Sequence, residues 1–197
     1  MNREQGEDAA KSRMEGQESA KGIHELVHLL VYVAVVFLVT FLVITYVGQR
    51  TQVNGESMYP TLYDKDNLIV DKLSYRFRDP ERYDIIVFPY QYDKSTFYIK
   101  RIIGMPGETV YIDPRGTIYI NGEALQESYG REIIQSAGLA EEEITLGEDE
   151  YFVLGDNRNN SSDSRDPNVG NIHKEDILGK AWIRIWPLSK MEVLDHQ

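Results

Sequence analysis

The chain of 197 residues contains no cysteine, and its basic residues are outnumbered by acidic ones. Without thiols, a cysteine nucleophile, thiolate-bound zinc, an iron–sulfur cluster and a disulfide are all excluded. The 21 Lys and Arg against 32 Asp and Glu give a net charge of -11, whereas nucleic-acid binding usually needs a clustered basic surface. We therefore expect no nucleic-acid partner, and any catalysis must come from Ser, Lys, His, Asp or Glu.

Charge is also absent from one long segment, residues 26–47, whose sequence LVHLLVYVAVVFLVTFLVITYV is mostly apolar. As a helix rising about 1.5 Å per residue it would be about 33 Å long, close to the roughly 30 Å of a bilayer core. A cleaved signal peptide would have a shorter apolar region, of about 7 to 15 residues, ending at a small-x-small site. No such site follows here, so the sequence predicts a transmembrane helix.

Basic residues differ between the two sides of this segment. Four Lys or Arg precede it in a polar tail, residues 1–25, and only Arg50 and Lys65 follow it closely. An excess of Lys and Arg marks the cytoplasmic side of a membrane helix. We expect a single-pass protein of the cytoplasmic membrane, with its N-terminus inside and residues 48–197 forming an extracytoplasmic domain.

Short apolar or alternating runs recur between turn signals in this outer domain, a pattern typical of strands. The runs are 67–70, 84–88, 97–104, 109–112, 117–120, 151–154 and 177–186. Residues 113–116 (DPRG) and Asn121-Gly122 suit tight turns, which favours a meander around them. The fold class predicted is mainly β, a sandwich or partly closed barrel, with residues 124–149 as a solvated acidic insert containing at most one short helix.

Two familiar catalytic patterns fit poorly. His24-Glu25-Leu26-Val27-His28 matches H-E-x-x-H, in which two histidines on one helix face hold zinc. The match lies at the cytoplasmic end of the apolar segment, and a third ligand would have to come from the polar tail or another chain. We expect no metal and no other cofactor. The chain also does not fit a Ser-His-Asp hydrolase, because it has no G-x-S-x-G elbow and its outer domain has only two histidines, His173 and His196.

Lys100 and Ser57 offer another chemistry. Lys100 lies in FYIKRII, where strand alternation puts Lys100 and Arg101 on opposite faces. Burial in apolar surroundings lowers a lysine pKa by up to about 3 to 5 units, and the neutral amine can then deprotonate a serine. Ser57 stands in a turn-rich loop (GESMYPTL) ten residues after Val47. From these residues alone, a solvated lysine tip and an ordinary loop serine remain open alternatives.

A third segment, GDNRNNSSDSR at 155–165, is polar throughout and follows an apolar run. An EF-hand fit fails because Arg158 occupies the third liganding position from Asp156. We expect Asp156, Asp163 and Arg165 to form ion pairs that fix this loop, with Arg101 as a further partner.

Together the segments resemble bacterial type I signal peptidases, which are membrane-bound Ser-Lys proteases. An N-terminal anchor is followed, in the family's order, by SMYPTL at 57–62, YDIIVF at 83–88, YIKRIIGMPGE at 98–108 and GDNRNNSSDSR at 155–165. The resemblance covers the outer domain except residues 124–149, and is to the single-anchor form typical of Gram-positive bacteria. It implies a β catalytic core with a smaller inserted β region near 111–150.

The resemblance also implies a role for each matching residue. Ser57 is the nucleophile, Lys100 the general base, and Ser161 the hydroxyl that orients the lysine. Ion-pairing residues support the site: Asp163, Asp156, Arg101 and Arg165.

Two residues beside the nucleophile match less simply. Met58 falls at the position thought to engage membrane or substrate. Gly55 stands where some members carry a serine that adds an oxyanion donor, so the Ser57 N–H remains and a second donor is left open.

The activity implied is removal of N-terminal signal peptides from exported preproteins, cutting after small residues of the Ala-x-Ala type. The partners implied are those preproteins, the phospholipid membrane and a nearby secretion translocon. A self-cleaving repressor or a peptidase for pilin-like exports would use the same dyad, although the anchor and the missing DNA-binding region argue against a repressor. A non-catalytic relative would have lost Ser57 or Lys100, and both are present.

Overall fold

The computed structural model describes residues 24–43 and 46–194. It divides into two units, Met1–Thr45 and Tyr46–Gln197. In the first, one helix, His24–Val43, is long and apolar enough to cross a membrane. Its apolar side chains are exposed, as contact with lipid would require. The segment predicted at 26–47 overlaps this helix, and residues 44–45 lie outside the described part.

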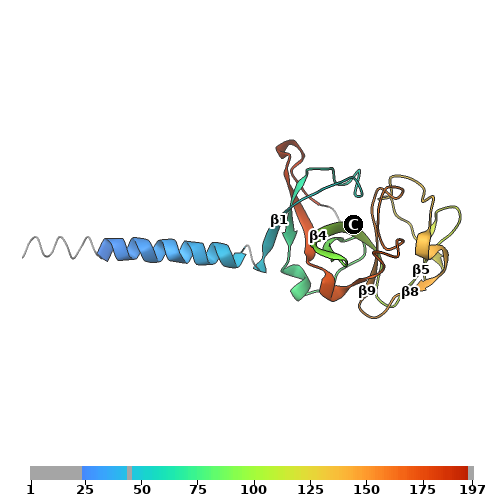
Figure 1. Ribbon diagram of the computed structural model, residues 1–197, viewed down its shortest axis with the longest axis horizontal. Coiled ribbons are helices and arrows are strands. Elements are labelled where there is room, and N and C mark those ends of the chain that lie inside the picture. The colour runs from blue at the N-terminus through green and yellow to red at the C-terminus, as the bar shows by residue number, and fades with distance from the viewer. Residues whose placement is uncertain (1–23, 44–45, 195–197) are drawn as a thin grey trace, which may run out of the picture. The chain divides into compact units, whose positions relative to one another are not determined.

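The second unit consists of two antiparallel sheets, which confirms the mainly β fold class. The larger sheet has the order β1-β2-β11-β3-β4-β9-β10, with β12 paired to β11, and the smaller has the order β7-β6-β5-β8. Within this unit, β5 and β8 lie at the end away from β1, with β4 and β9 between (Figure 1). The larger sheet contains β1 (Gly48–Gln52), β2 (Asn67–Asp71), β3 (Ile85–Tyr90), β4 (Asp93–Gly104), β9 (Glu150–Leu154), β10 (Ile172–His173), β11 (Gly179–Trp186) and β12 (Glu192–Val193). The smaller contains β5 (Thr109–Ile112), β6 (Ile118–Ile120), β7 (Glu123–Ala124) and β8 (Ile144–Thr145), and the 3-10 turns are η1 (Ser74–Arg76), η2 (Gly138–Glu141), η3 (Lys174–Asp176) and η4 (Leu188–Lys190).

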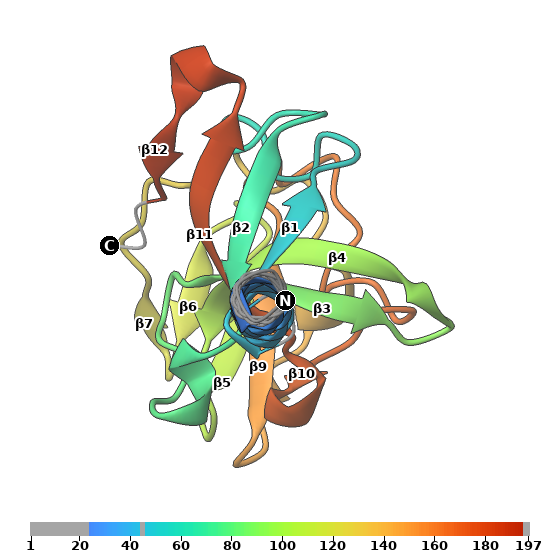
Figure 2. The ribbon, with the colours of Figure 1, turned by 90° about the vertical axis from the view of Figure 1, so that its left-hand side faces the viewer.

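Strand β3 begins with four consecutive apolar residues, Ile85 to Phe88, and it is buried on both faces. Ile85 and Val87 belong to one hydrophobic core, whereas Ile86 and Phe88 belong to another. Successive side chains on a strand point to opposite faces, so the run supplies both cores at once. β3 pairs with β4 in a long hairpin that extends out beside the rest of the sheet (Figure 2).

The smaller sheet is built by the two predicted tight turns. Between β5 and β6, the Asp113 carboxylate accepts hydrogen bonds from the N–H groups of Arg115 and Thr117. Between β6 and β7, Asn121 and Gly122 have φ values of 52° and 79°, as a turn of the Asn-Gly type requires. The chain therefore forms the expected meander from β5 to β7.

The insert at 124–149 is exposed over most of its length, as expected, but it also contributes buried apolar residues to a hydrophobic core. Ile134, Ala140 and Leu146 are buried in a hydrophobic core with β5 and β6. Glu127 forms an ion pair of 2.8 Å with the buried Arg158 of the 155–165 loop. The acidic composition concealed these apolar residues, which pack at irregular spacing rather than on a regular strand or helix.

Candidate active site

Ser57 and Lys100, 43 residues apart in the chain, meet in the second unit. The Lys100 Nζ lies 2.8 Å from the Ser57 Oγ. Lys100 is held by β4, where it lies opposite Ile86 of β3, and Ser57 by the loop that follows β1. The antiparallel hairpin fixes the lysine, so the contact depends on how the serine loop folds onto it.

The Lys100 side chain is only 4% exposed. Its Nζ also donates to the carbonyl oxygen of Ile99 at 3.0 Å and lies 5.1 Å from the centre of the Tyr98 ring. Burial lowers the pKa of Lys100 to about 8, because the charged form loses its hydration, while the negative charges of Asp163 and Asp156 act in the opposite direction. At pH 7 about a tenth of the amines are therefore neutral and able to accept a proton.

Hydrogen bonds tie the serine loop to the 155–165 loop. The carbonyl oxygen of Ser57 accepts the N–H of Asn157 at 3.0 Å, and the Asn157 side-chain amide donates to the Glu56 carbonyl at 3.1 Å. Across the described residues, the Ser57 N–H makes no hydrogen bond to a protein group. It is available to stabilise an oxyanion. The Gly55 N–H, by contrast, already donates to the Asp64 carboxylate at 2.9 Å, with Gly55 at φ 93°.

Arg101, the residue after Lys100 in β4, forms a buried ion pair with Asp156. The Arg101 guanidinium donates two hydrogen bonds to the Asp156 carboxylate, at 2.9 and 2.7 Å, and the two side chains are 1% and 0% exposed. The Thr61 hydroxyl donates to the same carboxylate at 2.5 Å, and the Tyr129 ring stacks 3.7 Å from the guanidinium. These contacts fix the start of the 155–165 loop against β4.

A second pair fixes the end of that loop. Arg165 contacts both carboxylate oxygens of Asp163 at 2.8 Å. The Asp163 Oδ2 also accepts the N–H of Gly155 at 3.0 Å, while Arg165 donates to the Ser136 carbonyl at 3.1 Å. The four ion-pairing residues named from the sequence thus form two pairs, one at each end of the loop.

Ser161 and Met58, also named from the sequence, both have buried side-chain atoms beside Ser57. The Ser161 Oγ is buried and makes no hydrogen bond in the described structure, to the Lys100 amine or to any other group. Met58 is 1% exposed and packs in the core beneath the serine loop. This burial does not support a membrane contact for Met58, whereas its position beside the groove described below is compatible with substrate contact.

Some residues of the site were missed from the sequence. Thr61 and Asn157 carry hydrogen bonds between loops, and Tyr129 comes from the insert that was expected to be solvated. For Thr61 and Asn157 the available signal was their position inside the motifs, whereas nothing in the sequence pointed to Tyr129. Gly155 is a fourth residue that was missed. The two loops pack so closely around it that a Cβ there would lie 2.2 Å from the Ser161 Oγ and 2.5 Å from the Ser57 carbonyl oxygen.

Replacing Gly155 with alanine is expected to lower kcat/KM by about 100-fold or more, since a displacement of about 1 Å at a catalytic centre can cost that much. The added methyl would push the two catalytic loops apart. The measurement is the rate of the peptidase reaction that the resemblance implies, with Gly147→Ala as the matched control because a Cβ there meets only the Glu150 side chain at 3.4 Å. Equal activity of the two variants would contradict the proposed close packing.

A groove of about 460 Å³ opens beside Ser57 and Lys100, and we call it the catalytic groove. It is lined by Thr51 of β1, by Val53 and Ser57 of the loop that follows, and by Tyr98 and Lys100 of β4. β1 and β4 are separated by three strands in the sheet order, so the sheet curls to bring both to one groove. An extended peptide laid along it would reach the serine.

The H-E-x-x-H histidines lie on the N-terminal helix. The rings of His24 and His28 are 4.2 Å apart at their centres, with Nε2 atoms separated by 3.1 Å. No group of three or more potential metal ligands occurs among residues 24–43 and 46–194. The polar tail, from which a third ligand was considered, lies outside the described residues.

Known proteins similar to this chain point to one family. The sequence profile of the family "Signal peptidase, peptidase S26" matches residues 25–186. A probable signal peptidase I-2 of Synechocystis is 41% identical over 155 residues, covering 76% of this chain and 68% of that protein. Signal peptidase I P of Bacillus subtilis subsp. natto is 35% identical over 156 residues, covering 76% and 83%.

A solved structure is also similar. The crystal structure of a signal peptidase I from Enterococcus faecalis is 35% identical in sequence, with a TM-score of 0.43, and the match covers 52% of this chain and 97% of that one. The family assignment depends on the sequence matches.

Proposed function

The chain belongs to the signal peptidase I family, peptidase S26, and is a serine endopeptidase that removes signal peptides; we propose that Ser57 is its nucleophile and Lys100 its general base. The observation that carries this proposal is the 2.8 Å contact between a serine hydroxyl and a lysine amine that is 4% exposed. A buried amine with its pKa lowered to about 8 is the form of lysine that can serve as a base near neutral pH.

The reaction follows from this geometry in two stages. Neutral Lys100 accepts the Ser57 hydroxyl proton as the oxygen attacks the scissile carbonyl carbon, and the Ser57 N–H donates to the developing oxyanion. The tetrahedral intermediate collapses to an acyl-enzyme, and the Lys100 ammonium returns its proton to the leaving amine of the mature protein. Water, deprotonated by neutral Lys100, then releases the signal peptide and regenerates the serine.

Free strand edges support binding of an extended substrate. β9 pairs with β4 only at Arg101–Gly104, and β1 pairs only with β2 among the described strands. The first part of β4 and the outer edge of β1 therefore keep backbone groups that can hydrogen-bond a peptide as an added strand. Alternate side chains of such a peptide would face the groove, and cleavage after Ala-x-Ala sequences would place small side chains there.

The membrane arrangement is part of the same proposal. One N-terminal apolar helix is consistent with a membrane anchor, and its length and composition suit a bilayer. The excess of Lys and Arg before it supports a cytoplasmic N-terminus and an extracytoplasmic catalytic domain. Preproteins emerging from a secretion translocon would then meet the serine on the same face of the membrane.

The pH dependence of cleavage tests the assigned base. Because only neutral Lys100 accepts the proton, kcat/KM should rise about tenfold between pH 7 and pH 9 and level off above a midpoint near 8. The measurement is the initial rate of preprotein cleavage by the full chain in detergent, with fluorescence of Trp182 and Trp186 as a check that the fold persists. A profile that is flat over this range would exclude Lys100 as the base, and loss of activity with chelator alone would favour a metal mechanism.

A further inference from the structure

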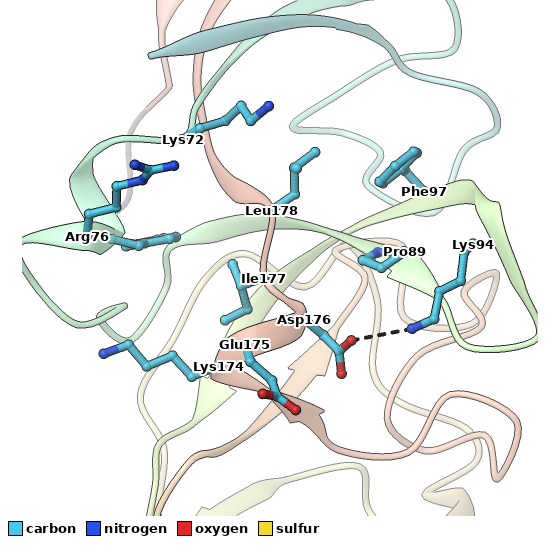
Figure 3. Close-up of a pocket in the computed structure, with 11 residues that line it drawn as sticks. Lys72, Arg76, Pro89, Lys94, Phe97, Lys174, Glu175, Asp176, Ile177 and Leu178 are labelled. Carbon is cyan, nitrogen blue, oxygen red and sulfur yellow. Dashed lines mark hydrogen bonds and ion pairs between the residues drawn. The ribbon is translucent and has the colours of Figure 1, made fainter. Parts of the chain in front are cut away.

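A second cavity, of about 500 Å³, lies outside the catalytic groove and is not used by the mechanism. Figure 3 shows side chains from four parts of the unit converging on it. Lys72 and Arg76 extend over one end, and Asp176 lies toward the other, where it pairs with Lys94 at 3.4 Å. Phe97 lines both this cavity and the groove, so the two are neighbours. We call this cavity the cationic pocket.

The two cations at the Lys72 end have no acidic partner among the described residues. The Lys72 Nζ lies 3.4 Å from the Gln49 side-chain oxygen, which is neutral, and Arg76 lies over the Tyr46 ring at 5.5 Å. The other basic residues of the pocket are paired, Lys94 with Asp176 and Lys174 with Asp79. A local excess of positive charge therefore remains at one end of the pocket, in a chain whose net charge is -11.

Chain connectivity keeps this end of the pocket close to the apolar helix. The Lys72 N–H donates to the carbonyl oxygen of Val47 at 3.0 Å. Val47 is four residues beyond Val43, where the described helix ends, so the chain between them spans at most about 14 Å. The covalent chain therefore limits how far Lys72 can lie from the end of the apolar helix, whatever the placement of the two units.

The neighbouring surface has the composition of a membrane interface. Phe77, which follows Arg76 directly, is 81% exposed, and Tyr46 is 47% exposed. Aromatic residues beside Lys and Arg are typical of the level of the lipid headgroups. A strongly acidic domain is repelled by an anionic membrane, so its approach requires a local cationic contact of this kind.

We propose that the cationic pocket binds the phosphate-bearing headgroup of an anionic membrane phospholipid, held by Lys72 and Arg76. The inference rests on the proposed membrane anchoring of the helix. A bound headgroup would hold the domain at the bilayer with the neighbouring groove close to the lipid surface, where signal peptides lie. The ligand class is set by charge: two unpaired cations favour a lipid with net negative charge over a zwitterionic one.

Native mass spectrometry of the full chain in detergent tests this inference, with phosphatidylglycerol or phosphatidylcholine added at equal concentration. The wild type should retain more phosphatidylglycerol than phosphatidylcholine. The double variant Lys72→Gln/Arg76→Gln should lose about 10- to 30-fold of that affinity, as expected for two cations at a lipid surface, with phosphatidylcholine binding unchanged. The matched control is Lys65→Gln/Arg115→Gln, which removes two cations from side chains that are 66% and 80% exposed elsewhere.

Four results would overturn the proposal. The double variant could keep the preference of the wild type, or the control could lose it equally, which would make the effect one of net charge alone. Displacement of the lipid by millimolar inorganic phosphate would assign the pocket to a soluble anion. A severalfold higher KM of the double variant than of the wild type, measured with a preprotein in lipid-free detergent, would assign the pocket to substrate binding. Peptidase activity in detergent is measured separately, so failure here is distinguishable from failure of the proposed mechanism.

Discussion

Replacing Lys100 with methionine is expected to lower kcat/KM for preprotein cleavage by about 10⁴-fold or more, the order reached when the base or nucleophile of a serine protease is removed. Methionine fills similar space, but it cannot accept the proton of the Ser57 hydroxyl 2.8 Å away. Ser57→Ala should cost as much, and the double variant little more, because the two residues act as a unit. The measurement is the single-turnover rate with a labelled preprotein.

Matched variants separate chemistry from folding in this experiment. Lys65→Met removes an exposed lysine, and Ser189→Ala removes an exposed hydroxyl, and both should cleave at the wild-type rate. If Lys100→Met or Ser57→Ala also cleaved at that rate, the assigned roles would be wrong.

The stability of Lys100→Met provides an independent check of the same residue. The pKa of Lys100 is about 8 in the folded chain and 10.5 as the reference value, so the unfolded state binds more protons between these pH values. Below pH 8 the buried amine must be protonated against its surroundings, which costs up to about 3 kcal/mol at 1.36 kcal/mol per pKa unit. The methionine variant should be more resistant to urea at pH 7 than the wild type, and the difference should shrink as the pH rises from 8 toward 10.5.

Replacing Asp156 with asparagine is expected to reduce the free energy of unfolding by about 3 to 5 kcal/mol, because it leaves the buried Arg101 guanidinium without its carboxylate. That is a large share of the roughly 5 to 15 kcal/mol typical of a domain. Activity should fall as well, since Asp156 precedes Asn157, whose N–H donates a hydrogen bond to the Ser57 carbonyl oxygen. Urea unfolding followed by tryptophan fluorescence measures the loss.

Two further variants show whether this loss comes from the uncompensated charge. Asp176→Asn breaks an exposed ion pair, with side chains 63% and 42% exposed, and should cost less than about 1 kcal/mol. Arg101→Met/Asp156→Leu removes both charges and should recover much of the stability while activity stays low. A double variant as unstable as Asp156→Asn would argue that packing, rather than a buried unpaired charge, is what the substitution disturbs.

The strands were predictable where apolar residues made the pattern. All seven predicted runs correspond to strands, including β3 and β4. Burial on one face of a strand requires apolar residues at alternate positions, and burial on both faces requires a continuous apolar run, so these strands can be recognised in the sequence. β1, with the sequence GQRTQ, was missed. It is polar and without clear alternation, and what makes it a strand is pairing with β2 at the edge of the sheet, from Gly48 opposite Asp71 to Gln52 opposite Asn67.

The contact between Ser57 and Lys100 was less accessible to reasoning from local sequence. Strand alternation placed Lys100 opposite in direction to Arg101, but nothing within either segment brings residue 57 to residue 100. The family resemblance supplied that pairing, and the fold shows how it is made. The role of the insert could not be read from its composition, because Glu127 and Tyr129 act through contacts with Arg158 and Arg101 that are distant in sequence.

The central claim is that the Lys100 amine is held against Ser57 with its pKa lowered to about 8, so that a neutral fraction is present near neutral pH. Its most direct test is an NMR titration of the lysine side chains in the full chain, carbon-13 labelled at Cε, with Lys100→Met identifying the signal of Lys100. We predict a midpoint near pH 8 for this lysine alone, coinciding with the midpoint of the pH-rate profile. A Lys100 signal that titrates with the other lysines, near the ordinary value of about 10.4, would contradict the account.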